Sequence, residues 1–389
     1  MAPLPPPNLN IPPSSSTVSV SAINTTSTLH GGPTSLMVSP PIQGHNWLAA
    51  PIYSFLIHHP PTNRRLLFDL GIRKDFQNLS PVIYHRLQEF GCKITVTKDV
   101  RDILEENGLA TRDIEAVVWS HHHFDHTGDM TRFGSQTKLI VGPEFREKML
   151  PGYPANPSST ILESDYEGRE LEELDFQNGK YKTLKIGRFG AVDYFGDGSF
   201  YLLDSPGHTV GHLCALARVQ SDGNKSSFVF LAGDSFHHPG EIRPSRYLPI
   251  PESIQPSPFS ALNTTSCCGS SCPGSIFDEI LKREGRPEGS AFYSPARLGE
   301  NSFHHDVDEL EVTVGKVQEA DCQDDIFVCA AHDESLLDVV EFFPEGTLND
   351  FTEKGLAKKA RWRFLSDFGR AVGRECDGEV KHPNDKWAV

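Results

Sequence analysis

Short apolar segments alternate along the chain with longer segments in which apolar positions recur at helical spacing. Runs of β-branched and aromatic residues predict buried strands at residues 114–119, 200–203, 228–232 and 326–331. Helices are predicted from Ser80 to Gly91, from Asp99 to Asn107 and from Asp306 to Ala320. Each begins with a side chain that can cap the first turn, and proline follows Ser80 at the first helical position. Strands that alternate with helices predict an α/β fold.

Four segments fall outside this alternation. They are a flexible N-terminal stretch, two insertions longer than ordinary loops and a helical C-terminal extension, at residues 1–15, 143–185, 236–305 and 345–389. The candidate functional residues described below run from His121 to His332, so a domain boundary between them would divide the site. We therefore predict one domain over residues 16–389.

Composition and charge narrow the class of protein. The chain has 389 residues, with 52 acidic and 36 basic side chains and a net charge of -16. This balance repels phosphate backbones, so we expect no nucleic-acid partner. No segment reaches the roughly 18 apolar residues of a membrane helix, and residues 1–13 lack the charge and apolar core of an export signal. We predict a cytoplasmic protein with a small-molecule substrate and no membrane partner; the oligomeric state stays open.

The cysteines predict no metal site of their own. Cys267, Cys268 and Cys272 cluster in a stretch rich in serine, glycine and proline, without an obvious fourth ligand. We interpret this stretch as a flexible loop with incidental thiols.

A dense group of histidines follows the predicted strand at 114–119, in the pattern H-x-H-x-D-H from His121 to His126. Residues two apart in an extended chain point the same way, so His121 and His123 can converge on one cation. Asp125 and His126, beyond the bend, can reach a second. Imidazole and carboxylate ligands suit zinc, iron or manganese, and the lack of cysteine argues against a closed structural zinc site.

Further ligand candidates follow the other predicted strands. His208 stands in a Pro-Gly-His turn after 200–203, Asp234 follows 228–232, and His332 follows 326–331. This arrangement is typical of a site that gathers ligands from several strands at one edge of a sheet.

The order H-x-H-x-D-H, P-G-H, G-D and late histidine resembles the metallo-beta-lactamase superfamily from Leu66 to His332. The resemblance implies a four-layer αββα sandwich with two metal ions at its rim, which we expect to be zinc, with iron or manganese as alternatives. One metal would be held by His121, His123 and His208, the other by Asp125, His126 and His332, with Asp234 between them. Asp69, at the end of an early strand, would orient ligands without binding metal.

Departures from known branches of the superfamily narrow the function. The best-known antibiotic-hydrolysing members have cysteine where this chain has Asp234, and the diiron oxygen-reducing members have glutamate where it has His123. The lactonase-like branch and fungal hydrolases that share residues 67–75 and 193–200 are closest. Quorum-quenching lactonases place a tyrosine where this chain has His237, which disfavours acyl-homoserine lactones as substrates.

The resemblance implies a dinuclear hydrolase that opens a lactone or lactam ring of a small aromatic natural product or xenobiotic by hydroxide attack on the carbonyl. Asp125 would hold the nucleophile and pass on its proton, and His237 or His238 could assist the leaving group. Two alternatives stay open: a thioesterase that releases a polyketide from a carrier protein, and a mononuclear iron dioxygenase acting on persulfides.

Aromatic and polar side chains of the insertions and of an early hairpin are candidates for substrate binding. The candidates are Trp47, Tyr153, His238, Arg243, Tyr247 and Tyr293. Together they predict a partly apolar, enclosed pocket rather than a rim open to a polymer.

Overall fold

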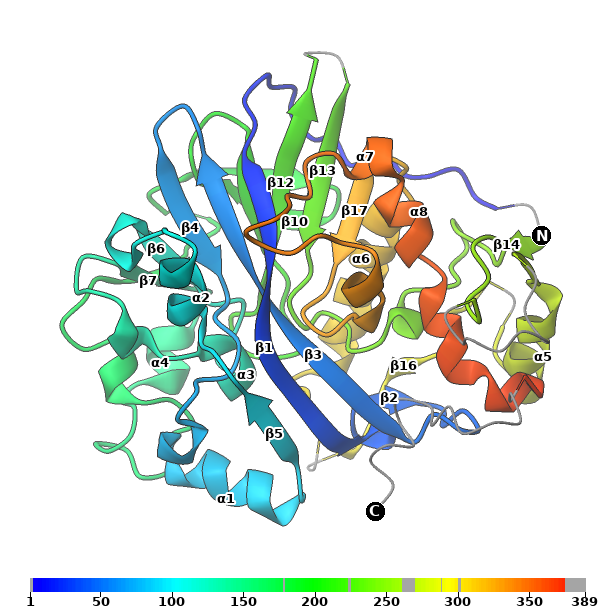
Figure 1. Ribbon diagram of the computed structural model, residues 1–389, viewed down its shortest axis with the longest axis horizontal. Coiled ribbons are helices and arrows are strands. Elements are labelled where there is room, and N and C mark those ends of the chain that lie inside the picture. Colours follow the sequence, from blue (N-terminus) through cyan, green and yellow to red (C-terminus); the bar gives the residue numbers. More distant parts are fainter. Residues whose placement is uncertain are drawn as a thin grey trace.

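Two β-sheets packed face to face form the centre of the protein (Figure 1). The computed structural model describes residues 3–374 except 178, 223–224, 261–269, 288 and 300–301. The first sheet has the strand order β5-β1-β3-β4-β6-β7-β8. Its strands are β1 (Ser19–Pro33), β3 (Trp47–His59), β4 (Arg64–Phe68), β5 (Lys93–Val96), β6 (Ala116–Val118), β7 (Lys138–Val141) and β8 (Leu171–Glu173).

The second sheet has the order β17-β13-β12-β11-β10-β9. Its strands are β9 (Lys182–Ile186), β10 (Phe189–Asp193), β11 (Phe200–Asp204), β12 (Leu213–Ser221), β13 (Ser226–Leu231) and β17 (Ile326–Cys329). The four strands predicted from apolar runs are β6, β11, β13 and β17. Strands β4, β6, β7 and β8 run parallel, as do β13 and β17, so the chain leaves several strands at the same edge.

The central strands are apolar throughout because both of their faces are buried. In β6, Ala116 and Val118 pack into the core between the two sheets, whereas Val117 packs into the core on the outer side of the first sheet. The segment 114–119 therefore shows an unbroken apolar run instead of an alternation with polar residues.

Helices cover the outer faces of both sheets. Helices α2 (Val100–Glu106) and α4 (Phe145–Met149) contribute to the outer core of the first sheet, and α6 (Val307–Asp321) packs Leu310, Val314 and Val317 on the second. Figure 1 shows α2 to α4 beside the first sheet, and α6 beside β17. The predicted αββα sandwich is confirmed.

Two of the three predicted helix starts have the expected side-chain cap. Asp99 accepts a hydrogen bond from the backbone of Asp102, and Asp306 accepts one from Glu309. Helix α1 (Pro81–Glu89) also begins where predicted. The expected serine cap is wrong in one respect, because the buried Ser80 hydroxyl has no hydrogen-bond partner among the described residues.

The early hairpin consists of the adjoining ends of β1 and β3 and the segment 34–46 between them. The second insertion, the early hairpin and the C-terminal turns share one apolar cluster, which we call the cap. It joins β2 (Val38–Ser39), β14 (Ser253–Ile254), β15 (Cys272–Pro273), α5 (Ser275–Arg283), β16 (Ser294–Pro295) and the turns at 363–372. The pairing of β16 with β2 attaches the insertion to the hairpin. Three segments that are far apart in the sequence thus build one structure beside the sandwich.

The C-terminal extension is not one continuous helix. Helix α7 (Phe351–Lys354) ends at Gly355, whose φ of 64° breaks the helical path, and α8 (Leu356–Ala360) and short 3-10 turns follow. Residues 375–389 of the predicted extension lie outside the described residues. The first insertion is partly regular as well, since it contains α4 and β8.

The N-terminal segment, predicted to be flexible, lies along the second sheet. Leu9 is buried and its carbonyl accepts a hydrogen bond from the Gly187 backbone, and the carbonyl of Pro12 accepts one from Arg218. Of the clustered cysteines, Cys267 and Cys268 lie outside the described residues, and Cys272 is buried in the cap. None of the helices in the described part of the chain has the length and apolar character needed to cross a bilayer.

Candidate metal centre

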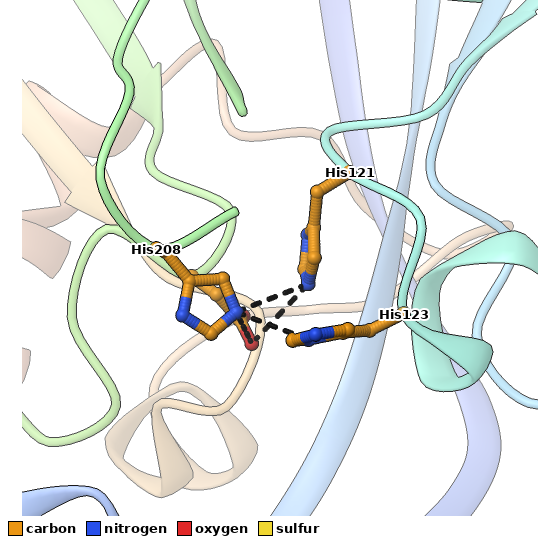
Figure 2. Close-up of side chains that lie close together, drawn as sticks. His121, His123 and His208 are labelled. Atoms are coloured by element: carbon orange, nitrogen blue, oxygen red, sulfur yellow. Dashed lines mark hydrogen bonds and ion pairs between the residues drawn. The ribbon is translucent and has the colours of Figure 1, made fainter. Parts of the chain in front are cut away.

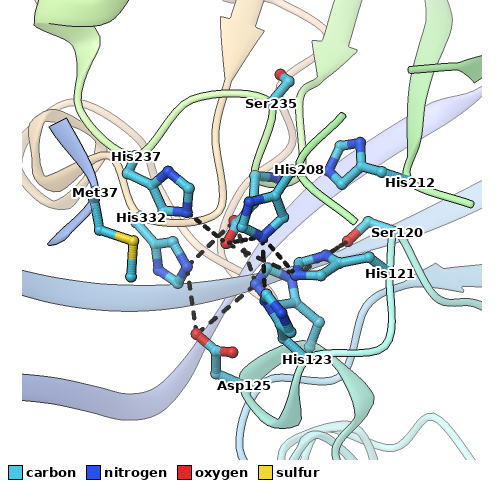
Figure 3. A network of polar contacts seen from close by, with 12 residues as sticks. Met37, Ser120, His121, His123, Asp125, His208, His212, Ser235, His237 and His332 are labelled. Atoms are coloured by element: carbon cyan, nitrogen blue, oxygen red, sulfur yellow. Dashed lines mark hydrogen bonds and ion pairs between the residues drawn. The ribbon is translucent and has the colours of Figure 1, made fainter. Parts of the chain in front are cut away.

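Histidine and aspartate side chains from the ends of four strands converge at one edge of the sandwich (Figure 3). The chain leaves β6 to present His121 and His123, and the short helix α3 (Phe124–Thr127) then turns Asp125 and His126 inward. Strands β11, β13 and β17 are followed by His208, Asp234 and His332, respectively. All seven residues predicted to bind metal therefore lie together.

The first group of possible ligands is His121, His123, His208 and Asp234, whose ligand atoms lie within 4.8 Å of one another. The Nε2 atom of His208 is 3.2 Å from His121 Nε2 and 3.1 Å from His123 Nδ1. Figure 2 shows the three rings pointing toward a common centre from two sides.

The second group is Asp125, His126 and His332. His332 Nε2 lies 3.4 Å from Asp125 Oδ2, and His126 Nε2 lies 3.8 Å from the same oxygen. In Figure 3, Asp125 and His332 face each other across this second group.

Asp234 links the two groups through its two oxygens. Its Oδ2 atom lies 3.9 Å from His121 Nε2 and 3.7 Å from His208 Nε2. Its Oδ1 atom lies 3.3 Å from both His126 Nε2 and His332 Nε2. One carboxylate can therefore contribute a ligand to each of two neighbouring cations.

The spacing of these atoms fits metal coordination. Ligands about 2.0 to 2.1 Å from a tetrahedral zinc ion stand about 3.3 Å from one another, close to the separations in both groups. Buried polar atoms without a partner are costly, yet His126 Nε2 and Asp234 Oδ1 have no hydrogen-bond partner among the described residues. Both atoms point into the second group, where a cation would satisfy them.

Electrostatics favours the metal-binding forms of the first group. Burial is the main cause that holds the pKa values of His121, His123 and His208 well below the usual value of histidine. Burial acts in the opposite direction on Asp234, but His126 and His332 outweigh it and keep the pKa of this carboxyl well below its usual range. In the first group the three imidazoles are thus neutral and the carboxylate is ionised, as metal ligands must be. In the second group burial lowers the pKa values of His126 and His332, but Asp234 and the other nearby carboxylates outweigh it and raise them.

Asp69 holds the loop that carries the histidines. Its carboxylate accepts hydrogen bonds from His126 Nδ1 at 2.9 Å, from the Ser120 backbone at 2.6 Å and from the Ser120 hydroxyl at 2.7 Å. Because His126 donates through Nδ1, its Nε2 is left as the atom that faces the site. Asp69 has a φ of 62°, a left-handed conformation that aspartate and asparagine tolerate better than most residues.

Two further contacts orient the ligands. His332 Nδ1 donates to the carbonyl of Pro51 at 3.0 Å, which directs its Nε2 inward. The backbone N–H of Asp234 donates to His212 Nε2 at 3.0 Å. Each of these partners lies on a different strand or loop from the residue it orients, so the sandwich itself sets the positions of the ligands.

His237 stands beside the two groups. Its Nε2 lies 3.4 Å from Asp234 Oδ2, and its ring is nearly parallel to that of His332 at 6.4 Å. The side chain is buried and lines the cavity described next, with Nδ1 unpartnered among the described residues.

A cavity of about 340 Å³ opens onto both groups. Its apolar wall comes from the early hairpin, from α1 and from the cap, including Leu36, Leu48, Ile83, Leu87, Phe303 and Phe364. His123, Asp125, His208, Asp234, His237 and His332 form its floor. Glu334, Asp338 and Asp367 line another part of the wall, where Arg363 pairs with Asp338.

Two of the predicted substrate-binding residues lie at or near this cavity. His238 lines it, with Nδ1 accepting from the Gly240 backbone and Nε2 lying 3.2 Å from Asp367. Tyr293 is buried behind the wall, 2.7 Å from His45 Nδ1. Because His45 lines the cavity, Tyr293 contacts a residue of the cavity wall and not the cavity itself.

The other four candidates are placed elsewhere. Trp47, Tyr153, Arg243 and Tyr247 lie outside the described lining of the cavity. Arg243 is buried, and its guanidinium is paired with Asp321 at 2.8 Å, so it contributes to the packed interior and not to the cavity. Tyr153 is bridged to Leu162 within the first insertion, and the ring of Tyr247 lies under its neighbour Arg246. An aromatic or arginine side chain close to a ligand in the sequence therefore did not identify the residues that line the cavity.

Sequence reasoning missed several residues of the site. His212 and His304 contact ligands from outside, and helix α1 supplies part of the cavity wall. His212 lies four residues after His208 in the sequence, so a search for neighbouring histidines could have found it. The position of His304 depends on the path of the second insertion, for which the sequence carries no signal.

Comparison with protein families and curated proteins agrees with this geometry. The model of the metallo-beta-lactamase superfamily matches residues 48–266. The metallo-hydrolase mfmC of Annulohypoxylon moriforme is 44% identical over 374 residues, which cover 95% of this chain and 92% of that protein. The gamma-lactamase FDB1 of Fusarium pseudograminearum is 42% identical over 369 residues, which cover 93% of this chain and 85% of that protein.

Among solved structures, a mutant of B. thuringiensis AiiA with N-decanoyl-L-homoserine bound at the active site has a similar fold. The TM-score is 0.53 at 15% sequence identity, covering 85% of this chain and 99% of that structure. At this identity the likeness concerns the fold alone.

Proposed function

The chain belongs to the metallo-beta-lactamase superfamily, and we propose that it is a dinuclear metal-dependent hydrolase that opens the lactone or lactam ring of a small aromatic compound. The observation that carries the proposal is the position of Asp234. Its Oδ2 atom faces the first group of ligands, and its Oδ1 atom faces the second. The gamma-lactamase activity in the name of a relative that matches nearly the whole chain supports a cyclic amide or ester as substrate.

We propose zinc for both positions. Imidazole and carboxylate donors without cysteine suit zinc, and the interatomic spacing fits its short bonds. His121, His123 and His208 would hold one ion, Asp125, His126 and His332 the other, and Asp234 both. A pair of metal ions in such a site supplies Lewis-acid chemistry, because it lowers the pKa of water and polarises a carbonyl group.

The residues of the chain would divide the remaining work. Asp125 lines the cavity floor and would orient the attacking water and accept its proton. His237, with an unpartnered Nδ1 atom, would donate a hydrogen bond to the ring heteroatom that leaves. The apolar wall would hold the rest of the substrate and limit access of bulk water.

The shape of the cavity supports a small substrate. Its volume of about 340 Å³ falls at the lower end of ligand pockets, which run from about 300 to 1,000 Å³. Apolar side chains from α1 and from the cap form much of the wall, which suits a ring system. His238 and Asp367 would contact polar substituents of the substrate.

The test combines metal analysis with a substrate panel. We expect two zinc ions per chain and hydrolysis of aromatic γ-lactams or lactones in preference to thioesters, acyl-homoserine lactones and β-lactams at equal concentration. Activity confined to thioesters would refute the ring-opening proposal and favour release of an acyl group from a carrier. One iron per chain with oxygen uptake on persulfides would refute hydrolysis altogether.

A His237→Ala variant tests the role of that side chain separately. General acid and hydrogen-bond catalysis contributes about 100-fold to 10,000-fold, so kcat should fall within this range while two metals stay bound. Unchanged turnover on the preferred substrate would remove His237 from the reaction.

A further inference from the structure

His304 occupies a position that no motif predicts. It precedes helix α6 at the end of the second insertion, is 3% exposed, and lies between His208 and the early hairpin. Its Nδ1 atom is 3.2 Å from His208 Nδ1, and its Nε2 atom is 3.2 Å from the carbonyl oxygen of Met37.

The directions of these hydrogen bonds follow from the Met37 carbonyl. A carbonyl oxygen only accepts, so His304 Nε2 must carry the hydrogen. In a neutral imidazole the other nitrogen then accepts, and His208 Nδ1 is the donor that faces it. His208 Nε2 is thereby left without a hydrogen, and this is the atom that lies among His121, His123 and Asp234.

The opposite arrangement is incompatible with metal binding. If His304 donated through Nδ1, His208 would accept at Nδ1 and a neutral His208 would carry its hydrogen on Nε2. That hydrogen would point at the place where a cation is expected. The carbonyl at the far end of the chain of hydrogen bonds therefore determines which nitrogen of His208 is available.

We propose that His304 is a positioning residue that fixes the tautomer and ring orientation of His208 for metal binding. The inference rests on the proposed metal centre but not on the proposed substrate. Met37 belongs to the hairpin that also forms a wall of the cavity. The cavity wall and one metal ligand are thus connected through a single side chain.

Paired amide substitutions test the proposal. The side-chain carbonyl of His304→Asn can take the place of Nδ1 and accept from His208, whereas the longer His304→Gln places its amide near Nε2. His304→Phe retains a ring but no acceptor. The matched control is His305→Ala, because His305 is the exposed neighbour of His304.

The measurement is a competition titration of purified, folded protein with zinc, together with absorption spectra after cobalt substitution. Loss of an outer partner of a metal ligand typically costs 10-fold to 100-fold in affinity. We expect that loss at one of two metals in H304Q and H304F, with an altered cobalt spectrum, and affinity nearer that of the wild type in H304N and H305A.

The inference would be overturned if each of the two metals bound to the wild type, H304N, H304Q and H304F with the same affinity. A loss in H304N as large as in H304Q would also overturn it, since packing alone would then explain the effect. Wild-type protein that binds fewer than two metals would instead refute the proposed metal centre, and normal metal binding without lactam or lactone hydrolysis would refute only the substrate.

Discussion

Replacement of Asp69 by asparagine should weaken metal binding by the second group without disturbing the fold. The left-handed backbone at Asp69 makes asparagine the appropriate probe, because alanine at a φ of 62° would add strain. Asparagine keeps one oxygen that can accept from the Ser120 backbone. Its NH2 group, however, would stand where Asp69 accepts hydrogen bonds from His126 and from the Ser120 hydroxyl.

The magnitude follows from the lost bond between Asp69 and His126. This contact is 2.9 Å long, and both side chains are buried. A hydrogen bond to a charged group contributes about 1.5 to 3 kcal/mol. At about 1.4 kcal/mol for each factor of ten, the zinc affinity of the second group should fall about 10-fold to 100-fold.

The assay is a zinc competition titration that resolves two dissociation constants. The ion of the second group should lose most affinity, with a smaller effect on the first group because the Ser120 hydroxyl also contacts His121 Nδ1 at 3.0 Å, and kcat at saturating zinc should recover substantially. The matched control is Asp193→Asn, since Asp193 is a buried carboxylate that accepts backbone hydrogen bonds from Gly196 and Gly198 away from the site. Equal zinc affinities in wild type, D69N and D193N would refute the reasoning from the His126 contact.

Three further predictions concern metal removal, pH and the cavity. Chelation should abolish turnover and lower the melting temperature, because zinc at about 100 times its dissociation constant stabilises a folded protein by about 2.7 kcal/mol. An unchanged melting temperature would contradict the prediction that bound metal stabilises the fold. Burial raises the pKa of Asp165 to about 7. Because the folded protein then binds this proton more tightly than the unfolded chain does, the free energy of unfolding should fall as pH rises from about 4 to about 7. Asp165→Asn should therefore stabilise the protein at pH 8, by at most about 4 kcal/mol. Parallel pH dependence of unfolding in both proteins would exclude this cause. Ile83→Trp should fill the apolar wall and raise KM at least about tenfold with little change in kcat, whereas the exposed His85→Trp on the same helix should not; equal KM values would place substrate elsewhere.

The central strands and the ligand candidates at their ends could be predicted because their signals are local, whereas the sandwich and the division of the ligands into two groups were implied by the resemblance to the superfamily. Segment 114–119 is apolar on both faces, which marks a buried strand, and the histidines follow where that strand ends. The structure brings His332 beside Asp234, as the resemblance implied, because β13 and β17 are parallel neighbours that leave the sheet at the same edge. Helix α6 was readable for the same reason, from Asp306 and the spacing of Leu310 and Val314.

The cavity wall could not be predicted because it depends on contacts between distant segments. The cap brings together residues of the early hairpin, the second insertion and the C-terminal turns. Nothing in the sequence distinguishes Phe364, which lines the cavity, from Tyr153, which does not. The predicted helical character of the C-terminal extension is confirmed over 351–372, but the sequence did not show that Gly355 divides it into short helices and turns.

The separation of the ligands along the chain has a consequence for biosynthesis. His121 and His123 are synthesised early, but the first group gains His208 and Asp234 much later, and the second group is complete only when His332 has left the ribosome. A nascent chain can therefore complete the second group only after the last strand, β17, has joined the sheet. Completion of the second group is thus one of the last events in the folding of the chain, although its first two members are synthesised early.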